Sequence, residues 1–177
     1  GCYHRFDVEE EARFIEKMEE AVMTAHETLL KANGDSQWSP ATTLTMVMLV
    51  APRAYIVHVG DTRAYYLRGE RLLQLTRDQT FGQYLLDTGA VSDEHVVESP
   101  MGRTLASAVG SSEVHPTVGL IDLEAGDTLL LCSDGPPRIV HDKRIAEILD
   151  EGLLSLEARA HKLIAEANER GGKDNIT

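Results

Sequence analysis

Residues 41–75 read ATTLTMVMLVAPRAYIVHVGDTRAYYLRGERLLQL, and this segment settles which kind of sheet the chain builds. It contains four short runs rich in Thr, Val, Ile and Tyr, the residue types that favour strands. The runs are 41–50, 54–59, 64–67 and 72–75. The intervals between them are too short for a crossover helix, so consecutive strands must run antiparallel. A doubly wound parallel sheet is therefore excluded in this part of the chain.

A long amphipathic helix is expected before these strands, from Asp7 to Asn33. Its apolar residues recur every three or four positions, which is the period of a helix with one buried face. Asp7 and Glu10 have the spacing of a capping box, in which each residue satisfies a backbone N–H of the other. The sequence therefore predicts where this helix begins.

The chain after the four strands begins with an irregular excursion at about 80–103, where glycine and proline surround two short helical patterns. Strands return at 114–122 and 128–133, and helices are expected at 142–150 and 155–170. This order is that of an α+β protein. The most economical arrangement is two packed antiparallel sheets with helices outside them.

Composition narrows the class of protein. A chain of 177 residues with 42% hydrophobic residues is expected to form one domain with a real core. The net charge of −12 argues against nucleic-acid binding, which needs clustered Lys and Arg. Two cysteines are too few for a disulfide framework, and no stretch approaches the roughly 20 apolar residues that span a bilayer. We therefore expect a soluble, cytoplasmic protein without a membrane or nucleic-acid partner.

Three aspartates each occupy a glycine-marked turn at the end of an apolar or helical run. Asp61 lies in Val59-Gly-Asp-Thr-Arg63, Asp134 follows the apolar run 129–132, and Asp174 lies in Gly171-Gly-Lys-Asp-Asn-Ile-Thr177. Each turn taken alone is typical of ordinary turn chemistry. Together, and without the His and Cys spacing of a zinc site, the three carboxylates favour a hard divalent cation such as Mg²⁺ or Mn²⁺.

The order of these segments resembles the metal-dependent serine/threonine protein phosphatases of type 2C, over almost the whole chain. The resemblance rests on five segments, which are 41–44, 59–65, 73–78, 126–135 and 171–177. It implies a four-layer α-β-β-α sandwich. It further implies that Asp134 and Asp174 bind a pair of metal ions, that Asp61 helps to hold a third, and that residues 80–103 form a flap beside the site.

The same resemblance implies an activity and its setting. A water shared between two metal ions would hydrolyse phosphoserine or phosphothreonine in proteins, so that no protein side chain is phosphorylated. Two cations at one site lower the pKa of the water and neutralise phosphate charge, which makes the scheme physically sound. The partners implied are a phosphoprotein substrate and a cognate Ser/Thr kinase system, and the chain is expected to be a monomer.

The chain also departs from the family pattern. The N-terminal motifs, which carry further metal-binding acids and the first core strands, are absent from this sequence. We therefore expect the sequence to be part of a longer protein and to be inactive by itself. Pro136, Pro137 and Arg138 follow Gly135 where the family has an acid at the third position, and Gln79 replaces a common His. We predict that Arg138 weakens metal binding or contacts phosphate, because reversing a charge beside a cation changes the local electrostatics strongly.

Two other functions fit parts of the sequence. Cys132 and Arg138 have the Cys-x5-Arg spacing of cysteine-dependent phosphatases. Against this, Asp134 would repel phosphate inside the loop, and Pro136 and Pro137 offer no N–H groups. The second alternative is a catalytically inactive pseudo-phosphatase that acts as a regulatory binding module, as the missing acids and Arg138 would suggest.

Overall fold

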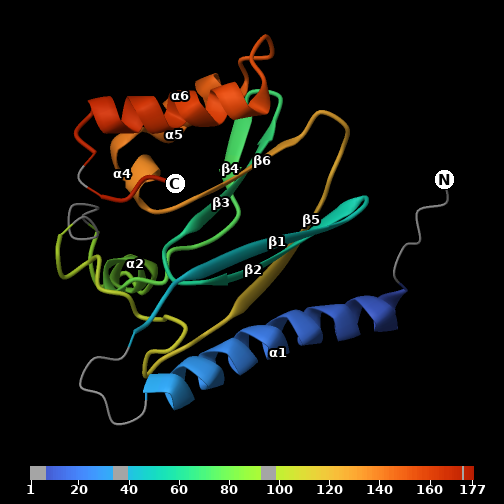
Figure 1. Cartoon of the computed structure of the whole chain (residues 1–177), viewed down its shortest axis with the longest axis vertical. Helices are drawn as coiled ribbons and strands as arrows, with labels where there is room; N and C mark the ends of the chain where they lie inside the picture. Colours follow the sequence, from blue (N-terminus) through green and yellow to red (C-terminus); the bar gives the residue numbers. More distant parts are fainter. Residues whose placement is uncertain (1–6, 34–39, 93–98, 173) are drawn as a thin grey trace. The chain divides into compact units, whose positions relative to one another are not determined.

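The computed structural model describes residues 7–33, 40–92, 99–172 and 174–177. They fall into two compact units, one from Gly1–Asp61 with Asp78–Leu123 and the other from Thr62–Arg77 with Glu124–Thr177. Each unit contains one three-stranded antiparallel sheet together with helices (Figure 1). The expected α+β class with two antiparallel sheets is confirmed. That residues 1–177 act as a single domain stays a prediction.

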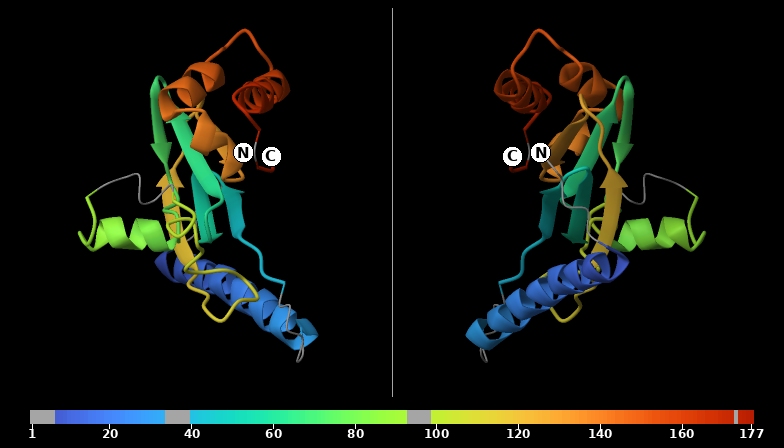
Figure 2. Two further views of the ribbon diagram at one scale, coloured as in Figure 1. Left: turned by 90° about the vertical axis from the view of Figure 1, so that its left-hand side faces the viewer. Right: turned by 90° about the vertical axis from the view of Figure 1, so that its right-hand side faces the viewer.

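The first unit is built on the sheet β1-β2-β5, with α1 packed against it. These elements are α1 (Val8–Asn33), β1 (Leu44–Val50), β2 (Arg53–Val59) and β5 (Thr117–Asp122). Figures 1 and 2 show α1 running along this sheet. Met18 and Val22 of α1 are buried against alternate residues of β2, namely Tyr55, Val57 and Val59. The predicted apolar stripe of the helix is therefore the face that meets the sheet.

Polar contacts fix both the start of α1 and its position on β2. The amide of Glu10 donates to Asp7 Oδ1 at 2.8 Å and the amide of Asp7 donates to Glu10 Oε2 at 3.0 Å, which confirms the capping box. Further along the helix, Glu11 accepts hydrogen bonds from the Tyr55 hydroxyl and from Arg53. These bonds hold the pKa of Glu11 below its usual value, so that it stays charged beside Arg53.

The second unit is built on the sheet β4-β3-β6, covered by two helices. Its elements are β3 (Arg63–Arg68), β4 (Arg71–Gln74), β6 (Thr128–Cys132), α4 (Gly135–Ile139), α5 (Asp142–Leu149) and α6 (Leu156–Glu169). Figure 2 shows α5 and α6 side by side, and they are in contact. Ile145 and Ile148 of α5, Leu163 of α6 and Leu67 of β3 share one core cluster. Burial of each of these large side chains is worth about 1.5–3 kcal/mol relative to exposure.

The pairing of the strands sharpens one prediction. β1 pairs with β2 and β3 pairs with β4, both antiparallel as expected. However, β2 and β3 are consecutive and do not pair, because the chain changes sheet at Gly60–Asp61–Thr62. The strands β5 and β6 likewise join different sheets. Local periodicity finds a strand but carries no information on its partner.

Two shorter elements complete the description. The helix α2 (Phe81–Asp87) begins the excursion at 80–103, where Thr80 caps it by accepting from the amide of Gln83. Residues 93–98 of this excursion lie outside the described residues. The helix α4 was not anticipated from the sequence, where Pro136 and Pro137 were considered only as residues that offer no N–H groups. Within the described ranges, no helix is both long and apolar enough to cross a membrane.

Candidate metal centre

Asp61 sits in a corner whose backbone only glycine can make. Gly60 has a φ of 105°, and a Cβ added there would lie 2.3 Å from Cγ2 and 2.6 Å from Cβ of Thr43. A side chain at position 60 would thus be both strained and in collision with its neighbour. The corner presents Asp61 as a buried carboxylate that is 9% exposed.

Gln79 holds this corner through neutral hydrogen bonds. Its Oε1 accepts from the amide of Gly60 at 3.0 Å, and its backbone amide donates to the Gly60 carbonyl at 2.7 Å. The Nε2 of the same side chain donates to the carbonyl of His115 at 2.8 Å. The substitution noted in the sequence therefore has a structural role. An amide can donate and accept at once, so Gln79 joins the backbone at Gly60 to the backbone at His115.

In the second unit, the segments that carry Asp134 and Asp174 lie against each other. Ser133 Oγ donates to the carbonyl of Asn175 at 2.9 Å and accepts from the amide of Thr177 at 3.2 Å. The amide of Ser133 donates to the carbonyl of Thr177 at 3.1 Å. A Cβ at Gly135 would lie 2.5 Å from the Asn175 carbonyl oxygen. The hydrogen bonds of Ser133 and the absence of a side chain at Gly135 together bring the two segments into contact. Sequence reasoning had not singled out Ser133.

The carboxylates of Asp134 and Asp174 converge on one positive group. Nη1 of Arg138 lies 2.5 Å from Oδ2 of Asp134 and 3.3 Å from Oδ2 of Asp174. The exposed fractions of the three side chains are 18% for Arg138, 23% for Asp134 and 51% for Asp174. Prolines are tolerated in the first turn of α4, where their missing N–H groups have no helical partner, and Arg138 follows in the same short helix. The helix therefore turns Arg138 back onto Asp134.

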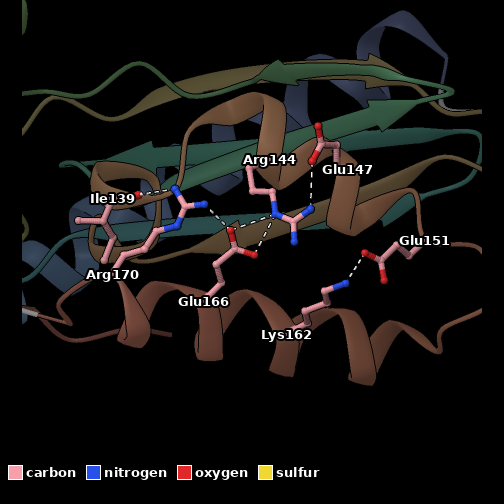
Figure 3. A network of polar contacts seen from close by, with 7 residues as sticks. All are labelled: Ile139, Arg144, Glu147, Glu151, Lys162, Glu166 and Arg170. Atoms are coloured by element: carbon pink, nitrogen blue, oxygen red, sulfur yellow. Dashed lines mark hydrogen bonds and ion pairs between the residues drawn. The ribbon is translucent and has the colours of Figure 1, made fainter.

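A network of charged side chains fixes the end of α4 to α5 and α6 (Figure 3). Both oxygens of Glu166 accept from Nε of Arg144, at 3.0 and 2.9 Å. Glu166 also pairs with Arg170, whose Nη1 donates to the carbonyl of Ile139 at 3.4 Å (Figure 3). The hydrogen bond from Arg144, followed by the charges of both arginines, lowers the pKa of Glu166. The last residue of α4 is thus anchored to α6.

The donor set fits a hard divalent cation in part. Asp134 and Asp174 offer carboxylate oxygens that already surround one cationic nitrogen, which is the ligand type that Mg²⁺ and Mn²⁺ prefer. Among the residues that the structure describes, no group of three His, Cys, Asp or Glu could hold a metal ion. Asp61 belongs to the other unit, so its convergence with the two aspartates stays a prediction.

Comparison with known proteins places these segments in a family. Residues 3–167 match the family described as protein phosphatase 2C. The chain belongs to the protein phosphatase 2C family. The resemblance first noted on five short segments is therefore confirmed across most of this phosphatase 2C chain.

Bacterial serine/threonine phosphatases are similar to this phosphatase 2C chain. PstP of Mycobacterium tuberculosis is 40% identical over 136 residues, which are 77% of this chain and 26% of PstP. The structure of the S. agalactiae serine/threonine phosphatase has a TM-score of 0.87 and 27% identity, covering 97% of this chain and 72% of that one. The PstP catalytic domain in complex with two manganese ions has a TM-score of 0.77 and 34% identity, covering 92% and 68%. The chain spans between 26% and 63% of the full length of relatives such as PstP, stp and PhpP.

The surroundings of Cys132 favour a structural role. The residue ends β6, is 9% exposed, and lines an apolar pocket with Leu130, Ile145 and Leu163. Burial in apolar surroundings disfavours the thiolate that a cysteine-dependent phosphatase requires. Arg138, the other half of that motif, is engaged by two carboxylates. The geometry therefore offers little support for the Cys-x5-Arg reading.

Proposed function

We propose that this chain supplies part of the catalytic site of a phosphatase that hydrolyses phosphoserine and phosphothreonine in proteins with Mg²⁺ or Mn²⁺. One observation carries the proposal. Asp134 and Asp174, held together by Ser133 and Asn175, direct their carboxylates at a common positive charge. Two acids that already share a cation are suited to share a metal ion.

In this proposal each residue has a separate role. Asp134 and Asp174 hold the metal pair, and Asp61 contributes to a third ion in the same catalytic domain of residues 1–177. When bound, the cations supply an activated water and offset the charge of the phosphate. Ser133 orients both acidic segments, and no side chain of the chain has to serve as nucleophile. The flap role of residues 80–103 belongs to the same proposal.

The setting of the activity is also a proposal. Relatives such as PstP are named serine/threonine protein phosphatases, which supports phosphoproteins as substrates. We propose in addition that a cognate Ser/Thr kinase produces these substrates, and that the protein acts as a monomer in the cytoplasm. Size-exclusion chromatography with light scattering would test the monomer.

A regulatory module without catalysis is the second candidate. The observation in its favour is Arg138, which places a positive charge between the two acids that should hold metal. Such a module would keep the fold and bind a phosphoprotein or another partner without turning it over. Arg138 could equally serve an active enzyme as the phosphate contact expected from the sequence.

The deciding experiment is hydrolysis of a phosphothreonine peptide with Mn²⁺ by the full-length gene product. The proposal expects turnover that is abolished by EDTA and by Asp134→Asn. Asp150→Asn removes the same charge at the end of α5 and should leave turnover unchanged. Cys132→Ser should also be active.

Each result discriminates between the candidates. Activity that survives EDTA but not Cys132→Ser would support the thiol mechanism and contradict ours. A folded full-length protein that binds the peptide without hydrolysing it, with and without Mn²⁺, would favour the regulatory module.

A further inference from the structure

Arg138 is held by both candidate metal ligands at once. The same nitrogen, Nη1, contacts Oδ2 of Asp134 and Oδ2 of Asp174, and the arginine is the least exposed side chain of the three. The two acids come from segments far apart in the sequence, and Arg138 is common to both. Among the described residues, the guanidinium of Arg138 is thus a positive charge shared by both carboxylates.

The carboxylate pair needs such a charge. Ser133 and Gly135 bring the segments of Asp134 and Asp174 close together by hydrogen bonding and by close packing on Asn175. Two like charges held near each other repel, and water screens Asp134, whose side chain is 23% exposed, less than Asp174, whose side chain is 51% exposed. A cation between them removes that repulsion, and either a guanidinium or a divalent ion can fill the role.

The two cations would use the same oxygen atoms. A metal ion bound by both acids has to take lone pairs of Asp134 and Asp174 that now face Arg138. Arg138 cannot diffuse away, because it lies four residues after Asp134 on α4, whose last residue is anchored through Arg170 to α6. The competing cation is thus always present at high effective concentration.

We propose that Arg138 is a tethered counter-ion of Asp134 and Asp174 that competes with divalent metal ions for these two carboxylates. The inference rests on the proposed function, since it assumes that the two acids are metal ligands. It assigns two effects to one residue. Arg138 keeps the pair assembled when metal is scarce, and it raises the metal concentration needed to fill the site.

The first test is calorimetric titration of Mn²⁺ into matched variants. Arg138→Met keeps the aliphatic bulk and removes the charge, and it should lower the Kd for Mn²⁺ by about tenfold or more, because one competing charge at ion-pair distance is gone. Arg138→Lys should stay closer to wild type. Arg71→Met removes a positive charge from β4 of the same unit and should leave the Kd unchanged.

The second test is thermal unfolding in EDTA, which needs no activity. Arg138→Met should melt below wild type because the carboxylates then repel, and Asp134→Asn in the Arg138→Met background should recover part of the loss. Mn²⁺ should raise the melting temperature of Arg138→Met more than that of wild type. A melting temperature that Arg138→Met leaves unchanged in EDTA would overturn the counter-ion role.

The outcomes separate this inference from the proposed function. If Mn²⁺ binds wild type and Arg138→Met equally well, competition is wrong while the metal site stands. If Arg138→Met raises KM for the phosphopeptide at an unchanged Kd for Mn²⁺, Arg138 contacts phosphate instead. If Mn²⁺ binds no variant, both the proposed function and the competition fail.

Discussion

The corner at Asp61 and the corner at Asp134 use opposite means to place an acid. The first is fixed by neutral groups, the side-chain amide of Gln79 and the steric demand of Thr43 on Gly60. The second adds charge, because Arg138 bridges Asp134 and Asp174. Neutral hydrogen bonds and packing respond little to salt or metal, whereas ion pairs respond to both.

This difference indicates which of the two corners can respond to metal ions. The backbone at Gly60 is held by packing and by neutral hydrogen bonds, and we expect it to respond little to salt or metal. Two acids that are balanced by an arginine side chain can exchange their ion pairs for a metal ion, while the arginine stays tethered nearby. We therefore expect substitutions at the first corner to change stability, and conditions in solution to affect mainly the second.

The largest expected effect is from Gly60→Ala at the neutral corner. The alanine backbone would have to adopt a φ of 105°, and its Cβ would lie 2.3 Å from Thr43 Cγ2, so backbone strain and steric overlap add. We expect a loss of about 3 kcal/mol in the free energy of unfolding, measured by thermal or urea denaturation. Gly69→Ala is the control, with a φ of 56° and no atom within 4 Å, and should cost only about 1 kcal/mol. Equal losses would show that Thr43 does not set the corner.

Gln79→Met should have the next largest effect. The variant keeps the length of the side chain and removes its bonds to Gly60 and His115. We expect a loss of about 2 kcal/mol, since a half-buried amide and a carbonyl lose their partners. The loss should be equal at low and high ionic strength, because the groups involved are neutral. A strong dependence on salt would contradict the contrast between the two corners.

Ser133→Ala should have a smaller effect at the charged corner. The variant loses the bonds from Oγ to the Asn175 carbonyl and from the Thr177 amide, while the ion pairs of Arg138 remain. We expect about 1 kcal/mol less stability and faster hydrogen exchange at the Thr177 amide, measured by NMR. Mg²⁺, which is diamagnetic and does not broaden nearby NMR signals, should slow that exchange again if Asp134 and Asp174 share the ion. Exchange that Mg²⁺ does not alter would argue against the shared site.

The smallest expected effect is a change of stability with pH that is caused by protonation of Glu166. The hydrogen bond from Arg144 lowers the pKa of Glu166 from 4.5. The contribution of Glu166 to the free energy of unfolding is therefore fully present above pH 4.5, and it is lost as the pH falls through the lower pKa of the folded state. The difference in melting temperature between wild type and Glu166→Gln should therefore narrow between about pH 6 and about pH 3. Glu157→Gln, whose side chain is 86% exposed, is the matched control. A constant difference across this range would contradict the assignment.

Much of the fold was predictable because its signals are local. The stripe and capping box of α1 lie within one segment, and the strands from 44 to 74 follow from residue type and short intervals. The change of sheet at Gly60 was not predictable, since a strand's partner depends on contacts with distant residues. The helix α4 was missed because Pro136 and Pro137 count as breakers in the middle of a helix but not in its first turn.

The sequence predicted which acids belong to the candidate site, but it did not predict how their side chains are arranged. The turns containing Asp134 and Asp174 were visible in the sequence, and the reversal of charge at Arg138 was visible beside them. The bridging of both acids by one guanidinium depends on the angle at which α4 leaves β6, which no local pattern encodes. The role of Gln79 was hidden for the same reason, because its partner His115 is remote in the sequence.

The contact between Thr43 and Gly60 makes these two positions depend on each other. The two atoms closest to a Cβ at position 60 are Cγ2 and Cβ of Thr43, and Thr43→Gly would remove both. If only one residue is substituted at a time, the measured loss of stability at position 60 includes the effect of Thr43, and the loss at position 43 includes the effect of Gly60. The cost of a side chain at position 60 therefore has two parts: the overlap, which depends on residue 43, and the strain of a φ of 105°, which does not.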